Sequence, residues 1–266
     1  MTTTADTAGI AARRERALAF RALHDNPALI APNAWDPISA MAIEQAGAKA
    51  IATTSYGVAA SRGVADGGGL NAEVALDALE RIIGAVTLPV TADLERGYAG
   101  TVEGAVETVT AAIDLGIAGL NIEDSLAQAL VPAAEQVTLL GAVAEAIRQS
   151  GVPAFLNART DTYLFRDPGV SDEDLLTETI DRGLAYVQAG ADGLFVPGLT
   201  DHAAIAAICG AVTVPVNLML GGEPVDLDEL FELGVRRVTW GPAFQIASQQ
   251  RLQQDIAALL GTKQQA

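Results

Sequence analysis

Two groups of acidic side chains stand where apolar runs of the sequence end. The run in "PVTADLERGYAG" ends in Asp93 and Glu95, and the run in "GLNIEDS" ends in Glu123 and Asp124. Carboxylates gathered in one place repel one another unless a cation lies between them, and oxygen ligands suit a hard cation such as Mg2+ or Mn2+. The sequence therefore indicates a divalent-cation site, provided that the fold brings these run ends together.

An arginine and several further polar residues follow other apolar runs in the same way. Arg159 comes at the end of "AFLNART", and its guanidinium could grip a substrate carboxylate through two parallel hydrogen bonds. A divalent cation beside Arg159 would create a positive pocket in a negative protein, which suits a small dicarboxylate or a 2-oxo acid. The further candidates are Asn33, Trp35, Asp36, Thr54, Ser55, Tyr56, Asn121, Asn157, Asp161 and Asn217, with Asp66 in the glycine-rich "GVADGGG".

Each of these residues also has a purely structural interpretation. The acids at the ends of the two runs could be ordinary loop charges, or they could favour the start of a following helix. Arg159 could pair with a neighbouring acid, Asp66 could be a turn residue, and Trp35 could be a packing residue. The joint pattern favours a site, because independent structural roles rarely place every acid at one edge of a fold.

The elements that must position these residues alternate along the whole chain. Eight short apolar segments, which we interpret as strands, are separated by helical patterns. The predicted strands cover residues 29–35, 50–56, 89–95, 119–125, 154–160, 193–199, 215–220 and 237–243. Strands alternating with helices form parallel βαβ units, and eight units match an α/β protein with a closed (β/α)8 TIM barrel better than a doubly wound sheet.

We expect a single barrel domain over residues 1–266. An amino-terminal helix is predicted at about 9–24 and a carboxy-terminal helix at about 244–260. In such a barrel the carboxyl ends of the strands share one face, and catalytic residues lie there. The acidic run ends are therefore predicted to meet at this face.

Composition excludes some classes of partner. The net charge of -17 disfavours nucleic acid, whose phosphates need a basic surface. The single cysteine, Cys209, excludes a disulfide framework and suits a reducing cytoplasm. The amino-terminal stretch lacks the apolar core of a signal peptide, and no run reaches the length needed to span a bilayer. We therefore expect a cytoplasmic protein without a membrane partner.

The motifs resemble those of the isocitrate lyase and phosphoenolpyruvate mutase superfamily. The matching stretches are "NAWDPISAMAIEQAGAKAIATTSYGVAASRGVAD", "PVTADLERGYAG", "GIAGLNIEDS", "NARTDTYL", "AGADGLFVPGL" and "RVTWGPA". They occur in the family's order from about residue 29 to about residue 245. The chain is thus identified as a member of this superfamily by resemblance over nearly the whole predicted barrel.

The resemblance implies a modified barrel with Mg2+ bound by Asp93, and with Asp66, Glu95 and Glu123 reaching the ion directly or through water. It also implies that Arg159 binds a substrate carboxylate or the enolate oxygen. The shared chemistry is the making or breaking of a bond to C3 of a pyruvyl unit through an enolate that the metal stabilises. Family members commonly form tetramers and often exchange the carboxy-terminal helix, so a homo-oligomer, either dimer or tetramer, is expected.

The residues expected to act in this chemistry fall into two overlapping sets. Those expected to be catalytic are Arg159, Glu123 and Tyr56. Those expected to contact the substrate are Trp35, Thr54, Ser55, Tyr56, Asp93, Arg159 and Asn217. The backbone N–H groups of residues 54–56 would surround the pyruvyl end of the substrate.

The sequence departs from the family pattern on the loop after the fourth strand. This loop reads "SLAQALVPAAEQ" and lacks the cysteine that lyases use as an acid, and Pro197 stands where other members place a histidine or glutamate. We therefore expect a Mg2+-dependent lyase, decarboxylase or hydrolase acting on a small 2-oxo acid. A non-catalytic 2-oxo acid binder and a phosphonopyruvate-type P–C bond enzyme remain alternatives. The loop from Ser125 to Gln136 is expected to be mobile and to close over the pocket.

Overall fold

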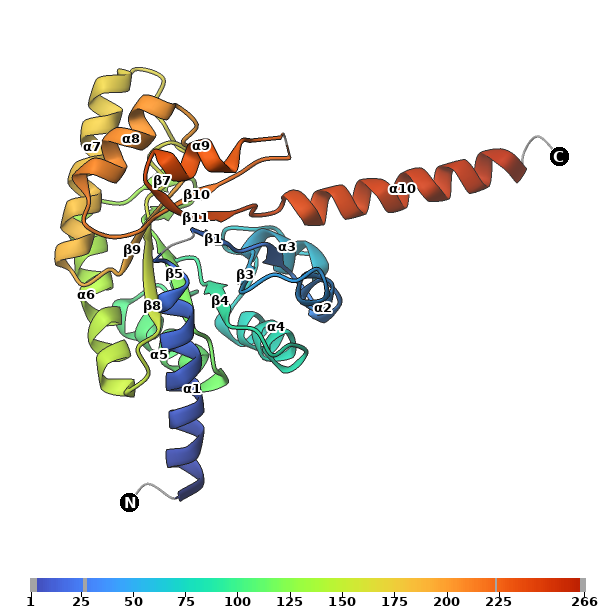
Figure 1. Ribbon diagram of the computed structural model, residues 1–266, viewed down its shortest axis with the longest axis horizontal. Helices are drawn as coiled ribbons and strands as arrows, with labels where there is room; N and C mark the ends of the chain where they lie inside the picture. Colours follow the sequence, from blue (N-terminus) through green and yellow to red (C-terminus); the bar gives the residue numbers. More distant parts are fainter. Residues whose placement is uncertain (1–3, 26–27, 223, 264–266) are drawn as a thin grey trace.

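The computed structural model describes residues 4–25, 28–222 and 224–263, and its centre is a parallel sheet that curls into a barrel (Figure 1). Within these residues the strand order is β1-β11-β10-β9-β8-β5-β4-β3-β2. The strands are β1 (Leu29–Ile30), β2 (Asn33–Ala34), β3 (Ile51–Thr53), β4 (Val90–Asp93), β5 (Gly119–Glu123), β8 (Phe155–Arg159), β9 (Gly193–Pro197), β10 (Val216–Met219) and β11 (Val235–Thr239). The predicted TIM-barrel fold class is confirmed.

The barrel closes through the first strand segment, which is divided into β1 and β2. β1 pairs with β11, and β2 pairs with β3, so the two edges of the sheet are joined through one stretch of chain. Pro32 lies at the division and has no N–H to donate. The N–H of Ala31 donates to Val238 on one side, while the carbonyl of Pro32 accepts from Ala52 on the other.

Helices surround the sheet and follow the strands in the predicted rhythm. They are α1 (Thr4–Ala22), α2 (Pro37–Gln45), α3 (Ser55–Ser61), α4 (Ala72–Gly84), α5 (Val102–Leu115), α6 (Ala133–Ser150), α7 (Asp172–Gln188), α8 (His202–Ala211), α9 (Leu227–Glu232) and α10 (Ala243–Lys263). Side-chain caps begin most of them, since a polar side chain satisfies free N–H groups of the first turn. The capping residues are Asp36, Thr54, Asn71, Thr101, Ser171, Asp201 and Asp226.

The main apolar core lies between the strands and the outer helices. Fully buried aliphatic residues of the strands include Ile122, Leu156 and Val196. They pack with buried residues of the helices such as Val109 and Leu140. Burying one such side chain stabilises the fold by about 2 kcal/mol. This packing makes the barrel a rigid support for polar groups at the strand ends. No helix within the described ranges is long and apolar enough to cross a membrane.

Two local elements differ from the sequence-based expectation. The second strand ends at Thr53 rather than near residue 56, because the Thr54 side chain caps α3 by accepting from the Gly57 N–H at 3.4 Å. The expected loop after the fourth strand is partly ordered. It forms a hairpin of β6 (Ser125–Leu126) and β7 (Ala129–Leu130), and α6 starts at Ala133.

The hairpin turn explains why this loop has a regular structure. Its two turn residues, Ala127 and Gln128, have φ values of 49° and 63°. Two consecutive residues with positive φ form the tight turn that matches the twist of a hairpin. Neither residue is a glycine, so the sequence carries no strong turn signal here.

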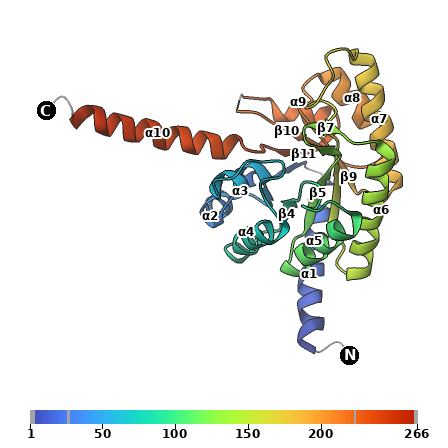
Figure 2. The ribbon, with the colours of Figure 1, turned by 180° about the vertical axis from the view of Figure 1, so that it is seen from behind.

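The two terminal helices lie outside the ring of barrel helices. α1 begins at Thr4, earlier than expected, and its Phe20 is fully buried against the barrel. The His24 ring stacks on the Phe155 ring with centroids 4.0 Å apart. α10 extends away from the barrel body in both views (Figures 1 and 2), and its Leu252 and Ile256 are largely exposed.

Candidate active site

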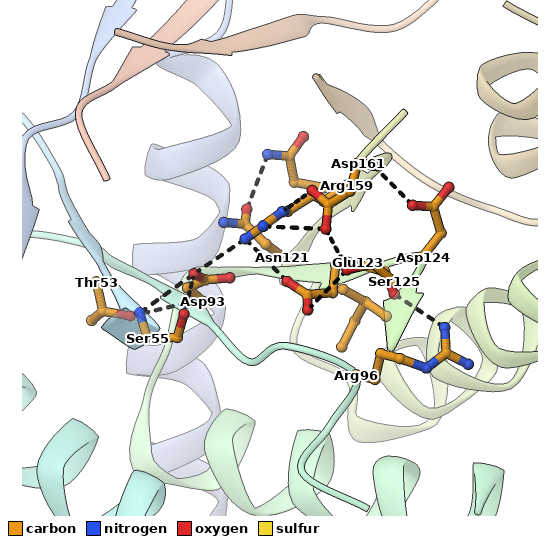
Figure 3. A network of polar contacts seen from close by, with 12 residues as sticks. Thr53, Ser55, Asp93, Arg96, Asn121, Glu123, Asp124, Ser125, Arg159 and Asp161 are labelled. Carbon is orange, nitrogen blue, oxygen red and sulfur yellow. Dashed lines mark hydrogen bonds and ion pairs between the residues drawn. The ribbon is translucent and has the colours of Figure 1, made fainter. Parts of the chain in front are cut away.

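The ends of four neighbouring barrel strands bring acids and an arginine together. Asp93 ends β4, Glu123 ends β5 and Arg159 ends β8, while Ser55 follows β3. In the parallel register, Asp93 lies beside Asn121, and Glu123 lies beside Arg159. Because the carboxyl ends of parallel strands share one edge, these side chains point toward a common region (Figure 3).

Arg159 is the centre of this group and contacts three acids. Its Nε donates to Asp161 Oδ1 at 2.6 Å, and its Nη2 donates to Asp161 Oδ2 at 3.2 Å. Its Nη1 lies 3.0 Å from Glu123 Oε2 and 3.7 Å from Asp93 Oδ2 (Figure 3). Burial alone would lower the pKa of Arg159, but the charges of Glu123, Asp161 and Asp93 outweigh it and raise that pKa. Arg159 therefore stays a cation at any physiological pH.

Asp93 is held on one side and has a free oxygen on the other. Its Oδ2 accepts from the Ser55 hydroxyl at 3.1 Å and from the Ser55 N–H at 3.4 Å. Its own N–H donates to Thr53 Oγ1 at 2.9 Å, which links β4 to β3. Its Oδ1 is buried and has no partner among the described residues. A buried carboxylate oxygen without a partner is costly unless another group binds it.

Glu95 lies in a strained turn directly after β4. Its φ is 48°, and that of Tyr98 is 52°, values that are uncommon for residues other than glycine. The turn is fixed by Gly97, whose N–H donates to Leu94 at 2.7 Å, and by the Glu95 carbonyl, which accepts from the Glu123 N–H at 3.0 Å. The Oε1 atom of Glu95 is buried without a partner in the described part of the chain. The strained backbone conformation of this turn therefore holds the Glu95 carboxylate near Asp93.

The acids of this group hold protons more strongly than ordinary carboxylates do. Burial, with the charges of Asp66 and Asp93, raises the pKa of Glu95 to about 7. Burial raises the pKa of Glu123 to about 8, although Arg159 opposes the rise. Burial and the charge of Asp93 also raise the pKa of Asp66. The group thus holds more negative charge than Arg159 alone offsets, which is what a site for a further cation requires.

These residues fit a hydrated Mg2+ or Mn2+ ion rather than a tightly enclosed one. Within residues 4–25, 28–222 and 224–263, no three acidic, histidine or cysteine side chains form a ready-made cluster around a metal position. The donors are nevertheless all oxygen atoms, and two of them, Asp93 Oδ1 and Glu95 Oε1, are buried and unpartnered. Mg2+ commonly keeps several waters and takes one or two carboxylates directly. Asp66 and Glu123 could then hold its waters.

A cavity of about 990 Å3 opens at this group of side chains. Asp66, Glu95, Glu123 and Arg159 line it, together with Ser55 and Tyr56 of α3. The β6–β7 hairpin contributes Leu126, Ala127 and Gln128 to the wall, and Arg96, Val64 and Phe165 complete part of the surface. The cavity therefore has a polar wall of acids and arginine and a partly apolar wall.

Four of the seven residues expected to contact the substrate are not among the residues that line this cavity: Trp35, Thr54, Asp93 and Asn217. Trp35 lines a separate apolar groove with Ile38 of α2 and Phe244 of α10. It also packs against Gly57, where a Cβ atom would come within 2.8 Å of the Trp35 Cβ. Asn217 is buried on β10, and neither atom of its amide has a partner among the described residues. Asn217 is not among the residues that line the cavity.

Asp124 supports the site from behind instead of capping a helix. It is fully buried and accepts from the Thr160 hydroxyl, the Asp161 N–H and the Tyr186 hydroxyl at 2.8, 2.8 and 2.7 Å. Arg182 donates to the same carboxylate at 3.2 Å. These bonds fix the residue that precedes the hairpin and the backbone of Asp161.

Sequence reasoning named Asp161 as a candidate without giving it a role, and it left Arg96 and Ser125 out of the expected site. Asp161 grips Arg159 and also accepts from the Ser125 hydroxyl. Arg96 donates to Gln136 Oε1 at 2.8 Å and to Glu135 Oε1 at 2.8 Å, so it ties the turn after β4 to the start of α6. The position of Asp161 two residues after Arg159, at the same predicted strand end, is the signal that made it a candidate. No comparable signal identifies Arg96 or Ser125.

Comparison with known proteins places this chain in a family. The family model for phosphoenolpyruvate phosphomutase matches residues 20–260. A crystal structure of a protein from Burkholderia cenocepacia, provisionally described as a phosphonomutase, superposes with a TM-score of 0.86 and is 40% identical, covering 93% of this chain and 99% of that one. An uncharacterised protein of Mycobacterium tuberculosis is 38% identical over 220 residues, 82% of this chain and 79% of that one. An oxaloacetate decarboxylase of a Bradyrhizobium species is 36% identical over 193 residues, 70% of this chain and 64% of that one.

Proposed function

Because the chain belongs to the phosphoenolpyruvate phosphomutase family, we propose that it is an enzyme that cleaves a carbon–carbon bond of a small 2-oxo acid or related dicarboxylate with a divalent cation. The observation that carries this proposal is the position of Arg159 among three acids, beside two buried acid oxygens without partners. A cation and an arginine at one cavity form a receptor for a small, doubly charged anion. Mg2+ is the expected ion, and Mn2+ is a substitute.

The side chains have distinct roles in this proposal. Arg159 is already a cation fixed by Asp161, so it can bind a substrate carboxylate without reorienting. Asp93 and Glu95 would bind the divalent ion through their unpartnered oxygens, and Asp66 and Glu123 would hold its waters. A bound Mg2+ would supply a positive charge that stabilises the negative charge developing on the 2-oxo oxygen. Of the backbone N–H groups of residues 54–56, that of Thr54 donates to the Ala34 carbonyl and that of Ser55 donates to Asp93, so the role of binding this end of the substrate passes to Tyr56.

Decarboxylation of an oxaloacetate-like acid demands the least from the remaining residues. The C3–C4 bond breaks, carbon dioxide leaves, and the bonding electrons pass to C3 and the 2-oxo oxygen. A proton then has to reach C3. None of the described residues that line the cavity is cysteine, histidine or lysine. Water can supply that proton, whereas cleavage of larger acids needs a placed acid, for which Tyr56, Glu95 and Glu123 on the cavity wall are the candidates.

The lack of cysteine, histidine and lysine among the described residues of the cavity wall favours a second candidate function. A protein that binds a 2-oxo acid without turning it over would need the cation and Arg159 but no proton donor. A P–C bond enzyme is the third reading, with Arg96 and Arg159 as the cations available at the cavity.

A substrate panel tests the proposal against both alternatives. The purified protein with Mg2+ is incubated separately with oxaloacetate, 2-methylisocitrate, dimethylmalate and phosphonopyruvate. Asp93→Ala serves as the matched control, since metal ions alone accelerate loss of carbon dioxide from oxaloacetate. Protein-dependent release of a 2-oxo acid from one of the three carbon acids, absent in Asp93→Ala, supports the proposal. Stabilisation by oxalate without any turnover supports the binder, and consumption of phosphonopyruvate alone supports the P–C enzyme.

We also propose that the protein is a cytoplasmic homo-oligomer in which α10 of one copy packs on another. An apolar groove of about 980 Å3 lies between α2 and the start of α10, where a (β/α)8 barrel ordinarily seats its last helix. Ile38 in this groove is 73% exposed, and Leu252, Ile256 and Leu260 of α10 are also exposed. Exposed apolar area of this kind on both surfaces is typical of an interface between copies.

A further inference from the structure

Arg237 is a buried cation inside the barrel that the proposed mechanism does not use. It lies on β11, where successive side chains point to opposite faces of the sheet. The preceding residue, Arg236, points outward and donates to the Phe231 carbonyl at the end of α9 at 3.2 Å. Arg237 points the other way. It is 1% exposed, and its guanidinium carbon lies 5.8 Å from the centre of the Phe20 ring of α1.

The guanidinium of Arg237 has no hydrogen-bond partner among the described residues. Its Nε, Nη1 and Nη2 are all buried and unpartnered. The other deeply buried arginines, Arg159 and Arg182, each form ion pairs with an acid. An unpaired buried charge is strongly destabilising, so a folded protein that keeps one has a reason other than stability.

Asp93 is the acid whose charge acts on Arg237. Burial lowers the pKa of Arg237 to about 10, and the carboxylate of Asp93 opposes that change. On the other side, burial and the Arg237 charge lower the pKa of His24 to about 3, so the histidine beside α1 is neutral and adds no second cation. Among the described residues, the Oδ1 atom of Asp93 and the three guanidinium nitrogens of Arg237 are all buried without a hydrogen-bond partner.

Other unsatisfied polar groups lie on the strands around this charge. Asn217 is the register neighbour of Arg237 on β10, and both of its amide atoms are buried without a partner in the described chain. Thr91 stands two residues before Asp93, hence on the same face of β4, and its hydroxyl is also unpartnered. The Oδ1 atom of Asp93 completes the group. Unpartnered polar atoms thus gather on the strands around Arg237, while the Phe20 ring and its apolar cluster lie on the other side of the guanidinium.

We propose that Arg237 is a positioning residue that acts through Asp93 from beneath, making the site bind a divalent cation less tightly and an anionic substrate more tightly. This inference rests on the proposed function. A fixed positive charge repels a metal ion seated on Asp93 and attracts the negative charge of a 2-oxo acid. The charge of Arg237 also offsets part of the repulsion among the four acids of the site when no ion is bound. These acids are Asp66, Asp93, Glu95 and Glu123.

Three variants separate this electrostatic role from a structural one. Arg237→Met removes the charge at similar volume, Arg237→Lys keeps it, and Arg236→Met removes the neighbouring guanidinium on the outer face. Calorimetry measures the affinity for Mn2+, and then for oxalate at saturating Mn2+. We expect Arg237→Met to bind Mn2+ several-fold more tightly and oxalate several-fold more weakly, with Arg237→Lys and Arg236→Met within twofold of the natural protein.

Tighter binding of Mn2+ together with weaker binding of oxalate is the result that identifies an electrostatic effect of Arg237. If Arg237→Met changes neither affinity, or weakens both together, the inference is overturned, because damage to the fold has no reason to favour the metal. Should Arg237→Met not fold, Arg237→Gln replaces it with the same expectation. Failure of both to fold would also overturn the inference, since the removal of an unpaired buried charge does not by itself unfold a protein.

A double-mutant cycle in metal-free protein tests the pair even if no metal binds. Arg237→Met, Asp93→Asn and their combination are unfolded by urea in EDTA. We expect Arg237→Met to shift the unfolding equilibrium constant at least fivefold more when Asp93 is present than when Asn stands there. Additivity within twofold overturns the inference. If the natural protein binds no Mn2+, the proposed function fails, and the cycle still decides whether Arg237 acts on Asp93.

Discussion

Replacing Asp161 by asparagine should lower the free energy of unfolding more than the removal of one charge from an exposed ion pair would. Asp161 is fully buried and grips Arg159 through bonds of 2.6 and 3.2 Å. Asparagine keeps the shape but presents an amide NH2 to a guanidinium nitrogen. Breaking a buried ion pair costs about 3–5 kcal/mol. Arg159 keeps Glu123 at 3.0 Å and Asp93 at 3.7 Å, so we expect the lower end, ~3 kcal/mol.

Urea and thermal unfolding of the metal-free protein measure this loss. A free energy of ~3 kcal/mol corresponds to a fall in Tm of about 5–10 °C for a chain of this size. Asp77→Asn is the matched control. Asp77 also contacts two guanidinium groups, those of Arg62 and Arg81, but its side chain is 37% exposed. We expect the control to lose much less stability than the Asp161 variant and to lose its effect in high salt, whereas the Asp161 effect persists. Equal losses for the two variants would refute the reasoning.

Three further predictions concern the metal, the hairpin and the assembly. Glu95 and Glu123 have pKa values raised to about 7 and about 8, so they must release protons when the ion binds. The affinity for Mn2+, measured by calorimetry, should therefore rise between pH 6 and 8 by ~10-fold per pH unit for each proton released. An affinity that does not change with pH would contradict this. Oxalate with Mg2+ should slow proteolysis at Ala127–Gln128 in the β6–β7 hairpin, which lines the cavity, and a cleavage rate that ligand does not change would count against closure. Deletion of residues 244–266 should reduce the mass of the assembly in light scattering, and an unchanged mass would argue against helix exchange.

The barrel could be predicted because its signal extends over the whole chain. Strands and helices alternate so regularly that the fold class follows without any tertiary information, and parallel order then places the strand ends at one face. Asp93, Glu123 and Arg159 lie at that face for this reason. The positions of these strand ends are set by backbone topology, which the pattern of apolar residues encodes.

Side-chain direction and local turns could not be predicted in the same way. Trp35 and Asn217 were expected at the same face, but Trp35 turns to the groove beside α2, and Asn217 lies near the start of β10, inside the barrel. Ser55 was expected on a strand and lies in α3, because the cap formed by Thr54 competes successfully with strand pairing over a short apolar run. Arg237 shows the limit most clearly. The sequence presents two adjacent arginines, and only the pleat of β11 decides which one enters the barrel.

Titration of Mn2+ followed by oxalate, with the natural protein and with Asp93→Ala, tests the central claim most directly. The account predicts that one Mn2+ binds to the natural protein, and that oxalate binds only once the ion is present. Asp93→Ala should lose affinity for the ion by roughly 100-fold or more, and with it the binding of oxalate. Equal affinity of the two proteins for Mn2+, or oxalate binding that does not depend on the ion, would contradict the account.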